Sequence, residues 1–283
     1  MAAPLRSFLF CSPLEFQASG IGSQPAADVL CLDLEDAVPP DLKPAARREA
    51  GKLLDSGVLG NQRAIFVRIN EIASDEGKRD AQWACDQATL IKGIILPKVR
   101  SPADILMLAE CLERNHADIG IHPIIEEPEG LKNVFDVLEA SPYVRGSFFG
   151  ANDLSVGLGC EPCWDALLYA RSRLVHAAAI AGIPACDAPS ANLNDLDALR
   201  ADCLRARSLG MSGKVLKTAA HVRTANQCFT PSRQELEKYR AIYALYMQAP
   251  ASPVIHEGKF IELPLVKRAK KMSETDWTTY GDD

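Results

Sequence analysis

The chain of 283 residues is 47% hydrophobic and 24% charged, so it can bury a full core and falls within the size range of a one-domain α/β barrel. Its net charge of -6 argues against a broad nucleic-acid-binding surface, because such surfaces carry an excess of Lys and Arg. No apolar run approaches the roughly 18 to 20 residues of a membrane span, and the first apolar run is shorter than that of a signal peptide. We therefore expect a cytoplasmic protein with neither nucleic-acid nor membrane partners.

Short aliphatic runs recur along the first 225 residues, and each is followed by a polar turn and a segment with helical periodicity. This alternation is typical of parallel strands that are covered by helices. Eight such strand-helix units favour a closed (β/α)8 TIM barrel over an open, doubly wound sheet. The predicted strands are Ser7–Cys11, Val29–Leu34, Ala64–Ile69, Gly93–Leu96, Ile119–Ile125, Gly146–Phe149, Ile183–Cys186 and Gly213–Leu216.

Two helices between these strands have clear start signals. Pro39, Pro40 and Asp41 precede one, and the other opens at Ser101 with Asp104 three residues on, the spacing of a capping box. After Ala225 the pattern becomes helical over 232–247, turns at 256–259 and ends in a charged helix over 265–272. We therefore divide the chain into a barrel domain, 1–225, and a C-terminal helical extension, 226–283, which could form a lid or an inter-subunit arm.

The working face of a parallel barrel is the carboxyl end of its strands. The polar residues at the ends of the predicted strands are rich in carboxylates, with a few bases and amides among them: Asp33, Glu35, Asp36, Arg68, Asn70, Lys98, Glu126, Glu127, Asn152, Asp153 and Asp187, together with Lys214 at the beginning of the eighth strand. Any single acid here could be a helix cap, but crowded carboxylates repel one another and raise one another's pKa. A hard divalent cation relieves that repulsion, and Mg²⁺ suits a set of oxygen ligands.

Seven ordered sequence blocks carry a resemblance to a known family. They are CLDLEDAV (31–38), FVRIN (66–70), LPKVRSPADI (96–105), PIIEEPEG (123–130), FFGANDLSVGLG (148–159), GMSGK (210–214) and FTPS (229–232). Together they resemble the citrate lyase β-subunit-like branch of the HpcH/HpaI aldolase superfamily, which includes malyl-CoA and citramalyl-CoA lyases. Their order and their positions at strand ends make the resemblance specific for the superfamily, whereas one block alone would be weak.

The resemblance implies a (β/α)8 barrel, a homotrimer or homohexamer, and a C-terminal segment that covers a neighbouring subunit's site. It implies that Glu126 and Asp153 bind Mg²⁺ and that Arg68 contacts the substrate. The acidic pair Glu35 and Asp36 would hydrogen-bond metal-bound water. The implied reaction is retro-Claisen cleavage of a small 2-hydroxy acid held as a CoA thioester, such as citramalyl-CoA, malyl-CoA or citryl-CoA, into acetyl-CoA and a 2-oxo acid.

Other site residues follow the same pattern, with some departures from it. Arg6, in the first block, and Lys98, at the end of the fourth strand, are expected to help bind the substrate. In the tail, Glu257 stands where the family often has an Asp that acts as the acid or base. The first block lacks the usual Gly-Asn turn, and the segment after Lys214 reads KTAAH (217–221) where the family usually has Ile-His-Pro, so Thr-Ala replaces His-Pro. We expect Lys217 and His221 to be solvated helix residues, although they could compensate for the lost groups.

Other functions remain open at this point. A free-acid aldolase of the pyruvate-enolate type would use the same metal but needs a His base, and no strand-end His stands near the predicted metal ligands. A non-catalytic accessory subunit could retain the metal fold, but a purely structural barrel has no need to keep these acids and Arg68 at one mouth. A thioesterase side activity would also fit the same residues.

Overall fold

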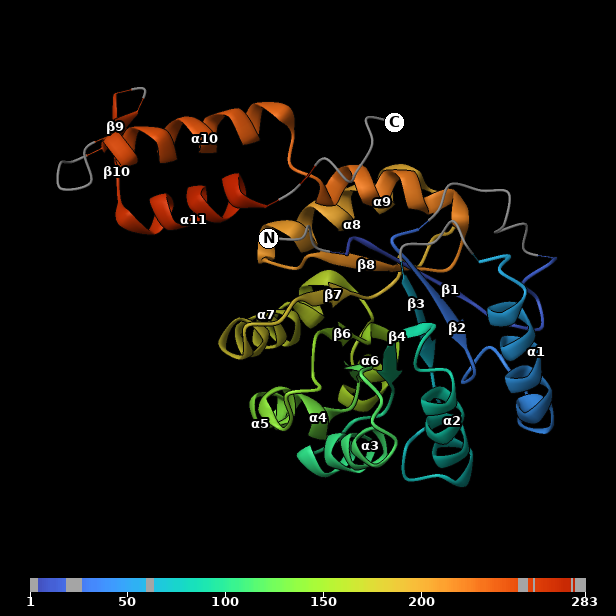
Figure 1. Ribbon diagram of the computed structural model, residues 1–283. Coiled ribbons are helices and arrows are strands. Elements are labelled where there is room, and N and C mark those ends of the chain that lie inside the picture. Colours follow the sequence, from blue (N-terminus) through green and yellow to red (C-terminus); the bar gives the residue numbers. More distant parts are fainter. Residues whose placement is uncertain are drawn as a thin grey trace. The chain divides into compact units, whose positions relative to one another are not determined.

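The computed structural model describes residues 5–18, 27–59, 64–248, 254–256, 258–275 and 277. Its eight parallel strands close into a barrel in which each strand pairs with the next and β1 pairs with β8 (Figure 1). The strands are β1 Ser7–Cys11, β2 Val29–Asp33, β3 Ala64–Arg68, β4 Ile91–Leu96, β5 Gly120–Ile125, β6 Ser147–Phe149, β7 Ala185–Asp187 and β8 Gly213–Leu216. The predicted (β/α)8 fold is confirmed, with strand ends that differ from the predicted ones by a few residues.

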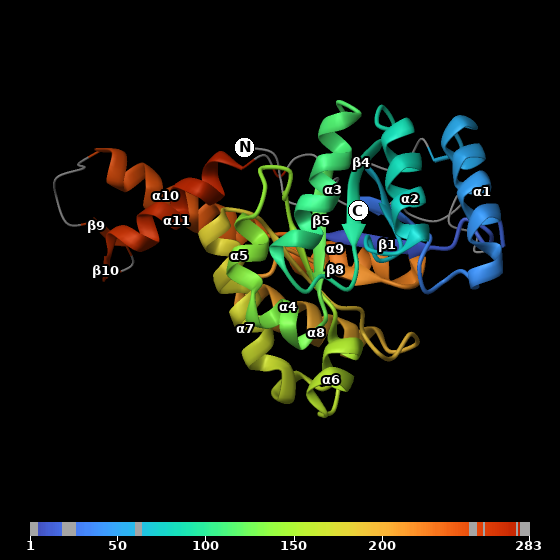
Figure 2. The same cartoon turned by 90° about the horizontal axis from the view of Figure 1, so that it is seen from below.

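Helices cover the outside of the barrel, and α1, α2 and α3 follow one another around it (Figures 1 and 2). Within the barrel unit the helices are η2 Pro40–Leu42, α1 Lys43–Asp55, α2 Asp75–Asp86, α3 Pro102–Arg114, α4 Pro128–Lys132, α5 Val134–Glu139, α6 Ala151–Leu158, α7 Trp164–Ala181, α8 Leu196–Leu209, η3 Ala219–His221 and α9 Val222–Phe229. No helix in the described part of the chain is both long and apolar enough to cross a lipid bilayer.

Side chains fill the barrel lumen because alternate residues of every strand point inward. Each of the eight strands contributes to this buried cluster, which consists of Phe8, Val29, Cys31, Phe66, Ile95, Ile124, Phe148, Cys186 and Val215. The Phe8 and Phe148 rings meet edge to face at 4.9 Å between centroids. Gly93 makes room for the Phe66 ring, since a Cβ at that position would lie 2.5 Å from it. The lumen is thus a packed floor beneath the carboxyl end.

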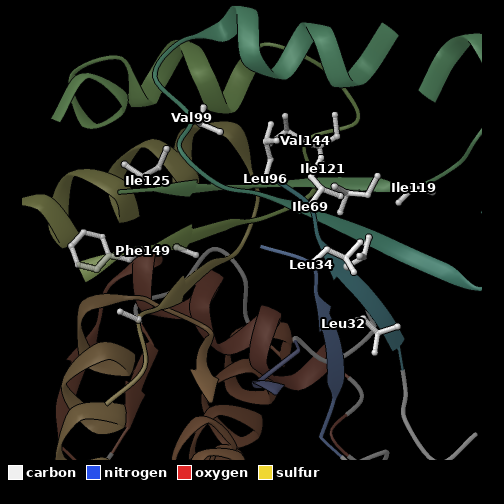
Figure 3. Packing of buried hydrophobic residues seen from close by; sticks show 14 of the residues in the cluster. Leu32, Leu34, Ile69, Leu96, Val99, Ile119, Ile121, Ile125, Val144 and Phe149 are labelled. Carbon is white, nitrogen blue, oxygen red and sulfur yellow. The ribbon is translucent and has the colours of Figure 1, made fainter. Parts of the chain in front are cut away.

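The other residues of each strand point outward and form a second, larger apolar layer against the helices. Figure 3 shows members of this layer, among them Leu34, Leu96 and Ile121, on the strand faces that the helices cover. On the helical side the layer is completed by residues such as Leu108 and Leu174, both fully buried. This layer carries most of the hydrophobic stabilisation, so the lumen end is free to hold polar groups.

A buried ion cluster lies in this outer layer beside β7 and β8. Asp187 accepts from Arg171 Nε at 2.9 Å and from Lys214 Nζ at 2.7 Å. The Arg171 guanidinium is held between the Phe149 and Trp164 rings, at 4.6 and 4.7 Å from their centroids. The sequence placed Asp187 and Lys214 among the polar groups at the mouth, and this was wrong. Both alternate with the inward-facing Cys186 and Val215, so they point to the helices.

The C-terminal residues from Thr230 form a separate compact unit, whereas Leu5–Phe229 form the barrel unit. The C-terminal unit pairs α10 (Arg233–Gln248) with α11 (Leu263–Glu274), and the hairpin β9 (Val254–His256) and β10 (Lys259–Ile261) lies between them in the sequence. Its small core includes Ile242, Ile261, Val266 and Ala269. Helix α9 runs through the boundary expected at residue 225, because it packs on β1 and β8. The lid or inter-subunit role of the extension stays a prediction.

The predicted start of α3 is observed, and it gives a first testable prediction. Asp104 Oδ2 accepts from the Ser101 backbone N at 2.9 Å, which satisfies one of the donors at the helix start. Replacing Asp104 by Ala is expected to lower the free energy of unfolding by about 1 kcal/mol and the Tm by about 2–4 °C, as calorimetry would show. Glu110→Ala, on the exposed face of the same helix, is the control. Equal changes in both variants would contradict the role given to the cap.

Candidate active site

A pocket of about 600 Å³ opens at the carboxyl end of the barrel, above the lumen floor. Its acidic and basic lining residues are five carboxylic acids and two bases: Glu15, Asp33, Asp36, Glu126, Asp153, Arg68 and Lys217. No histidine lines the pocket among the described residues. His122, on the inward face of β5, is buried against the Phe66 ring instead, and burial lowers the pKa of its imidazole to about 3. The pocket therefore has an excess of negative charge and no imidazole base among these residues.

Arg68, the last residue of β3, is surrounded by acids. Its Nε and Nη2 donate to the two carboxylate oxygens of Asp33 at 2.8 and 2.6 Å, a bidentate contact between adjacent strands. Its Nη1 lies 2.8 Å from Glu35 Oε2 and 3.4 Å from Asp36 Oδ2. The Arg68 guanidinium also lies over the Phe10 ring, 5.4 Å from its centroid. Arg68 is thus fixed in place, with its orientation set from β2.

The turn that carries Glu35 and Asp36 is held from two helices. Lys43, the first residue of α1, donates to the carbonyls of Leu34 and Glu35 at 2.8 and 2.6 Å. Asn70 donates to the Leu34 carbonyl at 2.9 Å, and its amide is in turn bound by Asp80 of α2. These contacts keep Glu35 buried, whereas Asp36 points into the pocket and is largely exposed. The two neighbouring acids therefore have different environments.

Lys98 connects Glu35 with Glu126. Its Nζ lies 2.8 Å from Glu35 Oε1, and its backbone N donates to Glu126 Oε1 at 2.8 Å. The backbone contact requires an unusual conformation, because Lys98 has φ 56°, in the left-handed region that a residue with a Cβ rarely adopts. Burial raises the pKa of Glu35, although Arg68 and Lys98 both oppose that rise. Lys98 therefore belongs to the site chiefly as a partner of its acids.

Glu126 follows β5 and is buried at the bottom of the pocket. Burial raises the pKa of Glu126 to about 8, and the negative charges of Glu35 and Asp153 add to the rise. Gly150 leaves space for this carboxylate, since a Cβ there would lie 2.3 Å from Glu126 Cβ and 2.7 Å from Oε2. One oxygen of Glu126 is hydrogen-bonded to Lys98, and the other faces a glycine. This side of the pocket is built around a buried carboxyl group that forms no ion pair with the described residues.

Asp153, in the first turn of α6, lines the same pocket as Glu126. The two acids therefore offer carboxylate oxygens from adjacent parts of the barrel mouth, one directly after β5 and one in the helix that follows β6. Mg²⁺ commonly takes one or two carboxylates and completes its octahedron with water and substrate, so the residues present fit this ion. A divalent charge next to Glu126 would also offset the unfavourable burial of the carboxylate.

The structure does not bring every predicted residue to this pocket. Arg6 precedes β1 at the opposite, amino end of the barrel, where Nε and Nη2 donate to Asp28 at 2.9 and 3.0 Å. That buried ion pair joins the starts of β1 and β2 and leaves Arg6 away from the pocket, so we no longer place it among the substrate-binding residues.

The other predicted residues have different outcomes. Glu257 lies outside the described residues. His221, expected to be solvated, is buried and contacts the Leu193 carbonyl at 3.0 Å, whereas Lys217 is exposed as expected.

Two site residues received no role from the sequence. Asp33 was counted as one of the strand-end acids, but not as the bidentate partner of Arg68. Ser12, directly after β1, also lines the pocket, and the sequence pattern gave it no role. The alternation of side chains along a strand predicts that both residues face the pocket. Asp33 lies two residues after the inward-facing Cys31, and Ser12 lies two residues after Phe10, which follows Phe8 on the same face.

Comparisons with known proteins identify the family of this chain. A profile of the HpcH/HpaI aldolase/citrate lyase family matches residues 6–219, which includes the whole barrel mouth. The chain belongs to the HpcH/HpaI aldolase/citrate lyase family. As a member of this family, the chain is an enzyme of the carbon-carbon lyase class, as the sequence blocks predicted.

Relatives of known name cover nearly the whole chain. A citrate lyase subunit beta-like protein from Deinococcus radiodurans is 30% identical, over 95% of this chain and 96% of its own. An L-malyl-CoA/beta-methylmalyl-CoA lyase from Rhodobacter capsulatus is also 30% identical, over 88% of this chain and 87% of its own. Among solved structures, the CitE protein from Mycobacterium tuberculosis, in complex with magnesium, acetoacetate and coenzyme A, is 25% identical with a TM-score of 0.74. That likeness covers 96% of this chain and 97% of CitE.

Proposed function

We propose that this family member is a Mg²⁺-dependent lyase that cleaves, or forms, the CoA thioester of a small 2-hydroxy acid. The products of cleavage would be acetyl-CoA and a 2-oxo acid, and citramalyl-CoA, malyl-CoA and citryl-CoA are the candidate substrates. The observation that carries the proposal is the meeting of Glu126, Asp153 and Arg68 at one pocket. The relatives named for CoA-ester and citrate lyases, and the magnesium of the CitE structure, support the same assignment.

Each site residue then has a defined task. Glu126 and Asp153 would hold Mg²⁺, which when bound supplies Lewis acidity to the substrate oxygen. Arg68 would orient the substrate carboxylate or stabilise the developing enolate, and its bidentate contact with Asp33 keeps that guanidinium in one place. Glu35 and Asp36 would orient water. The Lys98 ammonium group would bind substrate once it breaks its ion pair with Glu35. Glu257 stays our proposed acid or base.

The assembly and location belong to the same proposal. We infer a homotrimer or homohexamer in the cytoplasm, with the C-terminal extension acting on a neighbouring subunit. A free-acid aldolase remains the second enzymatic reading, but a His base is missing among the described lining residues. An accessory subunit would have no use for a buried carboxyl group such as Glu126, whose pKa burial raises.

The deciding experiment is mass spectrometry of the purified protein with Mg²⁺ and, separately, each of the three thioesters, repeated with EDTA. We expect Mg²⁺-dependent acetyl-CoA together with pyruvate, glyoxylate or oxaloacetate, which also identifies the acyl group. Release of free CoA and the intact hydroxy acid would indicate a thioesterase instead. The absence of any cleavage, with Mg²⁺ bound, would overturn the thioester assignment and favour a free-acid aldolase or an accessory role.

Mg²⁺ binding is expected to depend on pH, because the ion competes with a proton on Glu126. The pKa of about 8 means that this carboxyl is protonated below pH 8 and must lose its proton before it can bind the ion. The apparent affinity should therefore rise by about tenfold per pH unit up to about pH 8 and then level off. Titration calorimetry at pH 7 in buffers of different ionisation enthalpy should detect the released proton. An affinity that is constant between pH 6 and 8 would contradict this.

A further inference from the structure

A second polar corner lies in the pocket, at the ends of β1 and β8. Ser12 follows β1, is 3% exposed and lines the pocket, yet its hydroxyl has no hydrogen-bond partner among the described residues. A buried hydroxyl without a partner is unfavourable, because it has lost its water and gained nothing in return. The orphaned hydroxyl of Ser12 therefore points to a ligand group that the pocket is built to receive.

Lys217, which follows β8, supplies a positive charge to the same corner. Its side chain is exposed and lines the pocket, and no ion pair holds it within the described residues. The other two cations of the site are already neutralised, Arg68 by three acids and Lys98 by Glu35. Glu15 also lines the pocket, but no contact joins it to Lys217 in the described chain. Lys217 is thus available to an anion that enters the pocket.

The strand order places this corner opposite the metal acids. β1 and β8 are paired in parallel, with Phe8 opposite Val215 and Leu9 opposite Leu216, so their carboxyl ends lie side by side. β5, which carries Glu126, is four strands away from β1 in either direction around the closed barrel. A ligand held by Glu126 and Asp153 must extend across the mouth to reach Ser12 and Lys217. Such a ligand has oxygen groups at both ends.

We propose that Ser12 and Lys217 form a subsite for a second carboxylate on the acyl group of the substrate. The hydroxyl of Ser12 donates to one carboxylate oxygen, and the Lys217 ammonium neutralises its charge. This inference rests on the proposed function and reduces the number of candidate substrates. Among 2-hydroxy acyl thioesters, it selects those with an additional carboxylate, as in the citryl group, over those of the citramalyl and malyl kind.

The test compares two small 2-oxo acids on the Mg²⁺-loaded protein by titration calorimetry. Oxaloacetate has two carboxylates and pyruvate has one, and neither contains CoA. We expect oxaloacetate to bind about tenfold more tightly than pyruvate, the size of one charge-assisted hydrogen bond. Lys217→Met and Ser12→Ala should each remove most of that difference by weakening oxaloacetate alone. Lys92→Met, which removes an exposed lysine far from the pocket, should keep the full ratio.

The outcomes separate this inference from the proposed function. Equal oxaloacetate-to-pyruvate ratios in wild type, Lys217→Met and Ser12→Ala would overturn the subsite even if the protein cleaves a thioester. A ratio that Lys217→Met abolishes would uphold it even if no thioester is cleaved. A parallel titration with CoA tests the nucleotide phosphates as the other source of negative charge. If Lys217→Met weakens CoA but not oxaloacetate, the carboxylate assignment is wrong. Lys217 is exposed, so that variant is informative even if Ser12→Ala fails to fold.

Discussion

Replacing Glu126 by Gln is expected to lower kcat by at least about 10³-fold, or ~4 kcal/mol of transition-state stabilisation, and to weaken Mg²⁺ binding in the same variant. Gln keeps the volume of the side chain and an oxygen that can accept from the Lys98 backbone N, so the pocket geometry should survive. What the substitution removes is the ability of this side chain to lose a proton and bind Mg²⁺ as a negatively charged ligand. Steady-state kinetics on the identified thioester and calorimetric titration with Mg²⁺ measure the two effects.

The adjacent acid provides a matched control. Glu127 is the residue directly before α4 and does not line the pocket, so Glu127→Gln should change kcat by about twofold or less. If Glu126→Gln behaves like this control in both turnover and Mg²⁺ affinity, Glu126 is not a metal ligand. If it loses Mg²⁺ affinity but keeps turnover, the metal has no part in the reaction.

Replacing Arg68 by Ala is expected to cost stability as well as activity. The side chains of Asp33 and Glu35 are both 5% exposed, so without Arg68 they become buried charges with a much weaker set of partners. Removing one partner of such an ion pair lowers the free energy of unfolding by about 3–5 kcal/mol, which corresponds to a fall in Tm on the order of 10 °C. Differential scanning calorimetry measures this directly.

The pH dependence of the stability loss, and comparison with a second variant, test whether the loss in Arg68→Ala comes from the buried acids. Buried carboxylates without Arg68 have raised pKa values in the folded state, and they are neutral at low pH. The stability lost in Arg68→Ala should therefore be smaller at pH 5 than at pH 8. Arg100→Ala removes a half-exposed ion pair with Glu71 and should cost about 1 kcal/mol or less. A loss in Arg68→Ala as small as in Arg100→Ala would show that the acids do not depend on Arg68.

The sequence predicted the barrel well because its signals are local. Each strand is a short apolar run with a polar residue at its end, and the capping pair Ser101 and Asp104 marked the start of α3 correctly. The same reasoning placed Glu126, Asp153, Arg68 and Asp36 at one end of the barrel, and all four line the observed pocket.

The errors came from side-chain direction, which depends on the register of each strand. Asp187 and Lys214 were placed at the mouth, yet both point outward, where Asp187 accepts hydrogen bonds from Arg171 and from Lys214. Arg6 was assigned through its sequence block alone, although it precedes its strand and therefore lies at the amino end. The contacts of Arg68 with three different acids also required three-dimensional coordinates, because several of the strand-end carboxylates were equally good candidates.

The packed lumen also determines how ligands travel. Because Phe8, Phe66 and Phe148 fill the barrel below Glu126, a molecule that reaches this carboxylate enters and leaves on the same side. When one substrate becomes two products there, the inner fragment is trapped behind the outer one. Departure then has a fixed sequence: the fragment nearer the pocket opening goes first, and the one against Glu126 follows. In the direction of synthesis the order reverses, and the inner fragment must arrive before its partner.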